Sequence, residues 1–165
     1  TKPEIEQIIF SPKEATPDIE KKLYLRRKRI ENKIKAQSIN DFYVCSLSTQ
    51  TIVYKGMFLA EQLSEFYPDL LDNEFTSKFA IYHQRYSTNT FPTWSLAQPF
   101  RVLAHNGEIN TLKGNINWMS AHEPRITHPF FNERINDLKP ILDPDASDSA
   151  SLDACLLYTS PSPRD

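Results

Sequence analysis

Glycine and cysteine are both scarce in this chain, which has three glycines and two cysteines among its 165 residues. Three glycines cannot build a glycine-rich phosphate-binding loop, so the common nucleotide-binding loops are excluded. Cys45 and Cys155 lack Cys-x-x-Cys spacing and therefore predict neither a disulfide framework nor a zinc site. The few cysteines and the lack of an Asn-x-Ser/Thr sequon favour a reducing compartment.

Long apolar runs and an excess of charge are also missing. No apolar run approaches the roughly 20 residues that span a bilayer, and no apolar signal core stands near Thr1. The formal net charge of −2 predicts no strong attraction to nucleic acid or to an anionic membrane. We therefore expect neither nucleic acid nor membrane as a partner, and a cytoplasmic location, or a plastid one if the source is a plant or an alga.

The first strong pattern is a helix over residues 18–36. Four apolar residues recur along it at helical spacing: Ile19, Leu23, Ile30 and Ile34. Asp18 follows Pro17 and is a suitable N-cap. The helix is strongly basic, which allows two interpretations: a surface for nucleic acid or an acidic partner, or a solvated face balanced by acids elsewhere. The low net charge favours the second interpretation.

The remaining pattern mixes short strands with helices. Two β-rich runs, residues 42–48 and 51–56, are separated by a short polar turn and predict a hairpin. Further strands are predicted at residues 78–86 and 100–104, and helices at residues 59–66 and 109–121. Residues 143–153 predict a turn that ends in helix-capping residues. Together these elements predict an α+β fold with a mostly antiparallel sheet packed by helices.

Polar residues that could carry chemistry stand at predicted strand ends and loops. Arg85 presents a rigid charged fork that suits a carboxylate, and Asp148 can accept an ammonium group. Asn106 and Gly107 offer a side-chain amide and a backbone N–H that can converge on one oxygen, as an oxyanion hole requires. Together they would hold an α-amino acid and polarise its side-chain carbonyl. Each also has an ordinary interpretation, namely an ion pair, a helix cap or a plain Asn-Gly turn.

The same clusters contain residue types that could serve metal or serine chemistry. His83 and His105 have no carboxylate or cysteine near them at ligand spacing, so no metal site is predicted. A Ser-His-Asp arrangement stays open, although no Gly-x-Ser-x-Gly elbow is present.

Four runs of the sequence together resemble the class II glutamine amidotransferase domain, and more narrowly that of the glutamate synthase large subunit. These runs are His83–Trp94, Gln98–Phe100, His105–Asn115 and Ser147–Asp153. Other class II amidotransferases share Arg-x-x-Thr and Asn-Gly, but not the extension through Gly114 and Asn115. The resemblance covers roughly residues 18–153.

This resemblance implies an Ntn-hydrolase fold: a four-layer αββα sandwich of two antiparallel sheets between helix layers, here without the N-terminal part of the domain. It implies that Arg85 holds the α-carboxylate of glutamine and that Asp148 holds its α-ammonium group. Asn106, through its amide, and Gly107, through its backbone N–H, would form the oxyanion hole. Thr88 would lie in the substrate pocket.

The implied activity is hydrolysis of glutamine to glutamate and ammonia, followed by reductive transfer of the ammonia to 2-oxoglutarate in glutamate biosynthesis. No cofactor site is expected in this chain, whereas FMN and an iron–sulfur cluster are expected in the complete enzyme. Expected partners are L-glutamine, the remaining synthase domains of the same polypeptide, and a small NAD(P)H-oxidising subunit or ferredoxin. Two alternatives stay open: a stand-alone class II amidotransferase feeding another synthase, and a basic-helix binding module without catalysis.

The family's nucleophile is an N-terminal cysteine whose own free amine moves the proton. Cys45 and Cys155 are internal, and Thr1 is followed by Lys2-Pro3, which does not start a strand. We therefore expect the chain as given to be an internal fragment that is inactive alone.

The C-terminal residues depart from the family pattern. The family continues with a helix after Asp153, and the proline-containing stretch from Tyr158 is not expected to continue it. The sequence therefore predicts a partial glutaminase domain over residues 1–153 and a non-native tail over residues 154–165.

Overall fold

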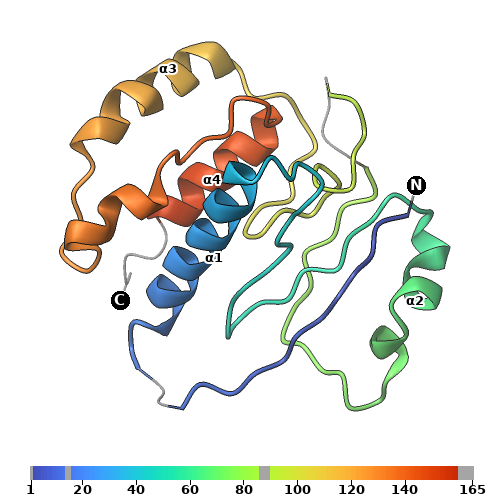
Figure 1. Ribbon diagram of the computed structural model, residues 1–165. Coiled ribbons are helices and arrows are strands. Elements are labelled where there is room, and N and C mark those ends of the chain that lie inside the picture. The colour runs from blue at the N-terminus through green and yellow to red at the C-terminus, as the bar shows by residue number, and fades with distance from the viewer. Residues whose placement is uncertain (1, 14–15, 86–89, 160–165) are drawn as a thin grey trace.

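The computed structural model describes residues 2–13, 16–85 and 90–159. Its α-helices are α1 (Ile19–Ala36), α2 (Leu63–Phe66), α3 (Leu112–His122) and α4 (Asp148–Thr159). Its 3₁₀ helices are η1 (Ala60–Gln62), η2 (Pro68–Leu71), η3 (Glu123–Arg125) and η4 (Asn132–Leu138). α1 and α4 lie in the centre, α3 lies along one side and α2 lies at the opposite end, with irregular chain between (Figure 1). No helix in the described ranges is both long and apolar enough to cross a membrane.

α1 confirms the predicted first helix and contributes to the main apolar core. Tyr24 and Leu25 of α1 are 6% exposed. They cluster with buried residues of the C-terminal half: Ile126, Phe131, Leu138 and Ile141. Ile30, one of the four apolar residues at helical spacing, lies outside this core cluster and is 42% exposed.

Asp18 precedes α1 as predicted but does not cap it with its side chain. Its Oδ1 atom instead accepts a hydrogen bond from Lys21 Nζ at 2.8 Å. The carboxylate still lies beside the first turn, where a negative charge stabilises the helix dipole.

The other predicted helices are confirmed with shifted bounds. Residues 59–66 contain η1 and α2, and the helix ends at Phe66, before Pro68 opens η2. α3 begins three residues later than predicted, because Thr111 before it has a φ of 62°. No residue of α3 is buried, and its Trp118 is 79% exposed.

α4 begins within the run in which capping residues were predicted, residues 143–153, and Ser147 of that run caps it. Ser147 Oγ accepts the Ala150 N–H at 3.1 Å, which satisfies one of the free donors of the first turn. The prediction that the helix cannot continue at Tyr158 is wrong, because α4 runs through Thr159. Leu157 and Tyr158 pack against the main apolar core, which gives the last turn a packing partner. The domain boundary at residue 153 itself stays a prediction.

The predicted sheet is absent from the described residues, none of which forms a strand. The hairpin of residues 42–48 and 51–56 is not formed, and residues 78–85 and 100–104 are likewise irregular. The layers of the implied sandwich are therefore not seen in the described part of the chain.

Two backbone N–H groups in these segments are engaged outside any strand ladder. The Val53 N–H donates to Ser46 Oγ at 3.3 Å instead of to a neighbouring carbonyl. The Phe100 N–H donates to the Leu103 carbonyl at 2.8 Å, which closes a tight turn where a strand was expected. A strand needs a neighbour that takes its backbone hydrogen bonds, and these groups are already engaged.

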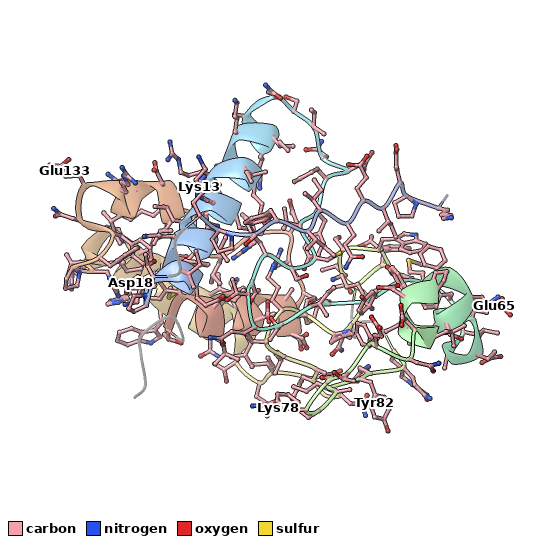
Figure 2. All side chains as sticks on the ribbon, turned by 90° about the horizontal axis from the view of Figure 1, so that it is seen from below. Lys13, Asp18, Glu65, Lys78, Tyr82 and Glu133 are labelled. Carbon is pink, nitrogen blue, oxygen red and sulfur yellow. The ribbon has the colours of Figure 1, made fainter. Side chains whose placement is uncertain are left out.

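Aromatic side chains pack together at the end of the molecule that contains α2. The ring centroid of Phe66 lies 4.9 Å from that of Phe58 and 5.7 Å from that of Trp94. Lys2 Nζ lies 4.8 Å from the Phe66 ring centroid. Tyr82, 80% exposed, lies at the edge of the molecule (Figure 2).

Candidate functional site

The segment that carries the predicted oxyanion hole, residues 105–109, is bound at its first residue by a buried glutamine. Gln98 is 6% exposed. Its Nε2 donates to the His105 carbonyl at 2.8 Å, and its Oε1 accepts the His105 N–H at 2.7 Å. Both backbone groups of His105 are therefore satisfied by one side chain.

The last residue of the same segment is bound by Asp148, the first residue of α4. Asp148 is 8% exposed, and its Oδ2 accepts the Ile109 N–H at 3.0 Å. Its Oδ1 accepts the Ser149 N–H at 2.6 Å. The structure thus brings two of the predicted site clusters together, with the carboxylate at a helix N-terminus where negative charge is favoured.

Asn106 and Gly107 lie between these two anchors. Asn106 is exposed and Gly107 is half-buried. A Cβ atom at position 107 would lie 3.1 Å from Cε1 of the His105 ring, closer than an ordinary contact. Since no described glycine has a positive φ, the backbone conformation at 107 does not demand glycine, and a larger residue there would have to shift the His105 ring by a few tenths of an ångström.

Arg85 makes no direct polar contact with the other predicted site residues in the part of the chain that the structure describes. It is exposed, and its backbone N and O atoms lie 3.0 Å and 2.9 Å from His83 Nδ1. Within the described ranges, no hydrogen bond or ion pair joins its guanidinium to Asp148 or Asn106. Thr88, predicted for the substrate pocket, lies outside the described residues.

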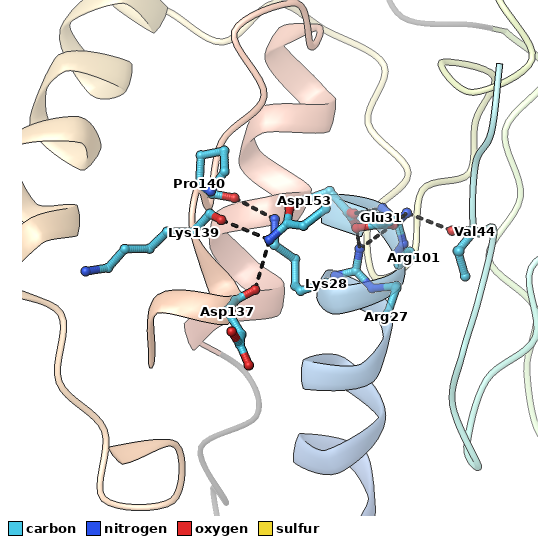
Figure 3. Close-up of polar contacts among 10 residues, drawn as sticks. Arg27, Lys28, Glu31, Val44, Arg101, Asp137, Lys139, Pro140 and Asp153 are labelled. Carbon is cyan, nitrogen blue, oxygen red and sulfur yellow. Dashed lines mark hydrogen bonds and ion pairs between the residues drawn. The ribbon is translucent and has the colours of Figure 1, made fainter. Parts of the chain in front are cut away.

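A network of charges that the sequence analysis missed joins α1 to α4 beside this segment (Figure 3). Arg101 Nη2 donates to Glu31 Oε1 at 3.1 Å, and Arg27 Nη1 lies 2.9 Å from both Glu31 oxygens. Asp153 on α4 is 1% exposed and lies 3.9 Å from Arg101 Nη1. Its other oxygen accepts the Val102 N–H at 2.9 Å. The signal in the sequence is a single arginine inside the apolar run 100–104.

Burial changes the protonation equilibria of this network. Desolvation lowers the pKa of Arg27 and raises the pKa of Asp153, while the Val102 N–H and Arg101 act to lower the latter. The Glu31 carboxylate favours the charged form of Arg27, and the Arg101 and Arg27 guanidinium groups favour the charged form of Asp153.

Lys55 is a buried cation near the same network. It is 4% exposed, and its Nζ donates to the Ser95 carbonyl at 2.7 Å. The ammonium lies 4.2 Å from the Tyr43 ring centroid and 5.2 Å from that of Phe100. Burial lowers the pKa of Lys55 to about 8, because desolvation disfavours the ammonium form.

The chain matches the family described as glutamine amidotransferases class-II over residues 1–164, and it therefore belongs to that family. Similar proteins are glutamate synthases. The chain is 64% identical over 155 residues to the large chain of NADPH glutamate synthase from Azospirillum brasilense. This match covers 93% of the chain and 10% of that protein. It is 51% identical over 157 residues to the chloroplastic ferredoxin-dependent glutamate synthase of Spinacia oleracea. This match also covers 93% of the chain and 10% of that protein.

A further relative is the large chain of NADPH glutamate synthase from Bacillus subtilis, 55% identical over 134 residues, with 81% of this chain and 9% of that protein covered. The chain thus spans about a tenth of the length of the curated relatives it matches. The family resemblance drawn from the four sequence runs is confirmed.

Proposed function

We propose that this chain provides the glutamine-recognition and oxyanion part of the glutaminase of a glutamate synthase. The observation that carries the proposal is the hydrogen bond between the Ile109 N–H and Asp148, which joins the segment of Asn106 and Gly107 to the first turn of α4. The family supplies the reaction class, and the similar proteins are named glutamate synthases rather than other amidotransferases.

Attack on a glutamine side chain places negative charge on the amide oxygen of a tetrahedral intermediate. In the proposed site, the Asn106 amide and the Gly107 N–H donate to that oxygen. Asp148 attracts the α-ammonium group of glutamine, Arg85 binds the α-carboxylate, and Thr88 lines the pocket. The exposed guanidinium of Arg85 makes no ion pair within the described residues, which leaves it available to an anion.

The proposed nucleophile is the N-terminal cysteine of the complete domain, whose free α-amine takes the thiol proton. Cys45 and Cys155 do not serve in this role, since both are internal. Burial also raises the pKa of the Cys155 thiol, which disfavours the reactive thiolate. We therefore propose that the chain as given binds glutamine weakly and hydrolyses none.

In the complete enzyme, the ammonia released would be added to 2-oxoglutarate by the remaining synthase domains. FMN and an iron–sulfur cluster would supply electrons there, drawn from NADPH or ferredoxin, through a small NAD(P)H-oxidising subunit where one is present. This chain does not itself fit an iron–sulfur cluster, because Cys45 and Cys155 supply two thiols and such clusters take four. The four-layer sandwich, a cytoplasmic location and a plastid location in plant forms belong to the same proposal.

The alternative of a basic-helix binding module has weaker support. A hollow of about 570 Å³ between α1 and η4 is lined by several cations, among them Arg26 and Arg134. However, most basic side chains of α1 have partners within the chain: Lys21, Lys22, Arg27, Lys28, Arg29 and Lys35. These contacts agree with a face balanced by acids and carbonyls of the same molecule.

The proposed function predicts separate kinetic effects in the complete enzyme. Asn106→Ala should lower kcat for glutamine hydrolysis about 10²- to 10³-fold, because it removes one oxyanion donor. Arg85→Lys should chiefly raise the KM for glutamine, because an ammonium cannot replace the bidentate fork. Steady-state ammonia release measures both effects.

Asn117→Ala, an exposed asparagine on α3, is the matched control and should keep wild-type kinetics. If Asn106→Ala and Arg85→Lys also keep wild-type kinetics, the assignment of the site is wrong.

A further inference from the structure

Gln98 makes an unusual pair of contacts for a side chain next to a candidate active site. The Gln98 Oε1 atom accepts a hydrogen bond from the His105 N–H at 2.7 Å, and its Nε2 atom donates one to the His105 carbonyl at 2.8 Å. A glutamine amide has one carbonyl and one NH₂ group in a fixed plane, so the two bonds fix the orientation of the His105 backbone. Gln98 is 6% exposed, and water therefore does not compete for these bonds.

The peptide that follows His105 is the one whose N–H belongs to Asn106, and the next carries the N–H of Gly107. Orienting His105 therefore orients the start of the segment that presents both proposed donors. At its far end, the segment is held by the bond from the Ile109 N–H to Asp148. The segment is thus fixed at two points, with the donors between them.

The His105 ring closes the remaining space beside Gly107. Its Cε1 atom would lie 3.1 Å from a Cβ at position 107, and its Nδ1 is buried without a hydrogen-bond partner among the described residues. The ring therefore packs against the backbone of Gly107 while the Gln98 amide holds the His105 backbone. A change at Gln98 would move the ring and the Gly107 N–H together.

We propose that Gln98 is a positioning residue of the oxyanion hole, which aims the Asn106 amide and the Gly107 N–H through its two bonds to His105. This inference rests on the proposed function, because it assumes that these donors bind the developing oxyanion. Gln98 touches no substrate atom in this role. Its effect should appear in the chemical step, since oxyanion donors act more strongly on the transition state than on bound glutamine.

The test uses Gln98→Met in the complete enzyme, because methionine keeps the length of glutamine and makes neither bond. A misplacement of about 1 Å can lower a rate about 100-fold, so we expect kcat for glutamine hydrolysis to fall about 10- to 100-fold. The KM for glutamine should stay within about twofold, because Arg85 and Asp148 are untouched. Glutamate formation from added ammonia should be unchanged, since it bypasses glutamine hydrolysis.

Gln50→Met is the matched control, because Gln50 is exposed, its backbone N–H donates to Ser48 Oγ, and its side chain has no hydrogen bond among the described residues. Gln98→Asn is the second variant for the case in which Gln98→Met does not fold. It keeps the amide but is one methylene too short to reach both groups of His105. Its kcat should fall at least about fivefold with an unchanged KM.

Two outcomes would overturn the inference. One is wild-type kcat in a folded Gln98 variant while Asn106→Ala loses activity, which would leave the proposed function intact. The other is an equal loss of the glutamine-dependent and ammonia-dependent activities, which would indicate a general structural role. Wild-type kinetics in Asn106→Ala would instead overturn the proposed function itself.

Discussion

The helical half of the molecule, built from α1 and the C-terminal residues, and the half built from residues 42–104 bury their apolar side chains to very different extents. Around α1, η4 and α4, a single cluster buries Leu138 completely and leaves Phe131 only 3% exposed. In residues 42–104, large apolar side chains remain open to solvent: Ile52, Leu59, Leu71, Phe75, Phe79, Ile81, Tyr82, Phe91 and Val102. The two halves therefore do not share one kind of core.

The difference follows from how each half satisfies its backbone. A helix pairs its own N–H and C=O groups, so its apolar face needs only a packing partner. An extended segment needs a neighbouring strand for the same groups, and here those groups bind side chains such as Ser46 Oγ. The buried charges of Arg101 and Asp153 then join the irregular half to the helices.

The largest expected effect is in the helical core. Leu138→Ala removes a fully buried side chain and should lower the free energy of unfolding by about 3–5 kcal/mol, because a cavity remains. Leu71→Ala, at a position 68% exposed in η2, is the matched control and should change stability by less than about 0.5 kcal/mol. Urea unfolding followed by circular dichroism measures both. Equal losses of unfolding free energy for Leu138→Ala and Leu71→Ala would contradict the conclusion that the two halves bury their apolar side chains to different extents.

The next effect concerns Lys55 in the irregular half. Its pKa is about 8 in the folded chain and 10.5 as the reference value, so between these pH values the unfolded chain binds more protons. The stability of the wild type should therefore rise with pH relative to Lys55→Met, by at most about 3 kcal/mol between pH 8 and 10.5. Urea unfolding of both proteins at several pH values measures this difference.

An exposed lysine of α1, changed as Lys33→Met, is the matched control and should follow the wild-type profile. A difference between wild type and Lys55→Met that stays constant with pH would contradict burial of the Lys55 ammonium. The irregular half would then be more open to water than its packing indicates.

The smallest effect concerns the junction between the halves. Asp153→Asn keeps an oxygen for the Val102 N–H but removes the charge that faces Arg101, and should destabilise the chain by about 1–2 kcal/mol at neutral pH. Burial raises the pKa of Asp153, so the folded chain takes up this proton more readily than the unfolded chain, and the stability of the wild type relative to Asp153→Asn should increase as the pH falls. Urea unfolding at neutral and acid pH measures it.

Asp72→Asn provides the control, because exposed Asp72 also accepts a backbone N–H, from Glu74, at 2.8 Å. It should change stability by less than about 0.5 kcal/mol. An equal loss of unfolding free energy for Asp72→Asn and Asp153→Asn would mean that the buried contact of Asp153 with Arg101 does not stabilise the chain.

The helices could be predicted because their signals are local. Helical spacing, Ser147 as a cap and Pro68 as a terminator all act within a few residues, and the structure confirms the elements they predict. The strands could not be predicted with the same success, because β-rich composition says nothing about whether a partner strand is present.

For the candidate site, the sequence by itself determined the residue types and the family: a guanidinium at Arg85, an amide at Asn106, a carboxylate at Asp148. These follow from side-chain chemistry and from runs of neighbouring residues. Only the tertiary structure decided that Asp148 meets the Ile109 N–H, 39 residues away, and that Gln98 binds both backbone groups of His105. Such contacts depend on where the chain turns in space, because hydrogen bonds form between groups that packing brings within about 3 Å.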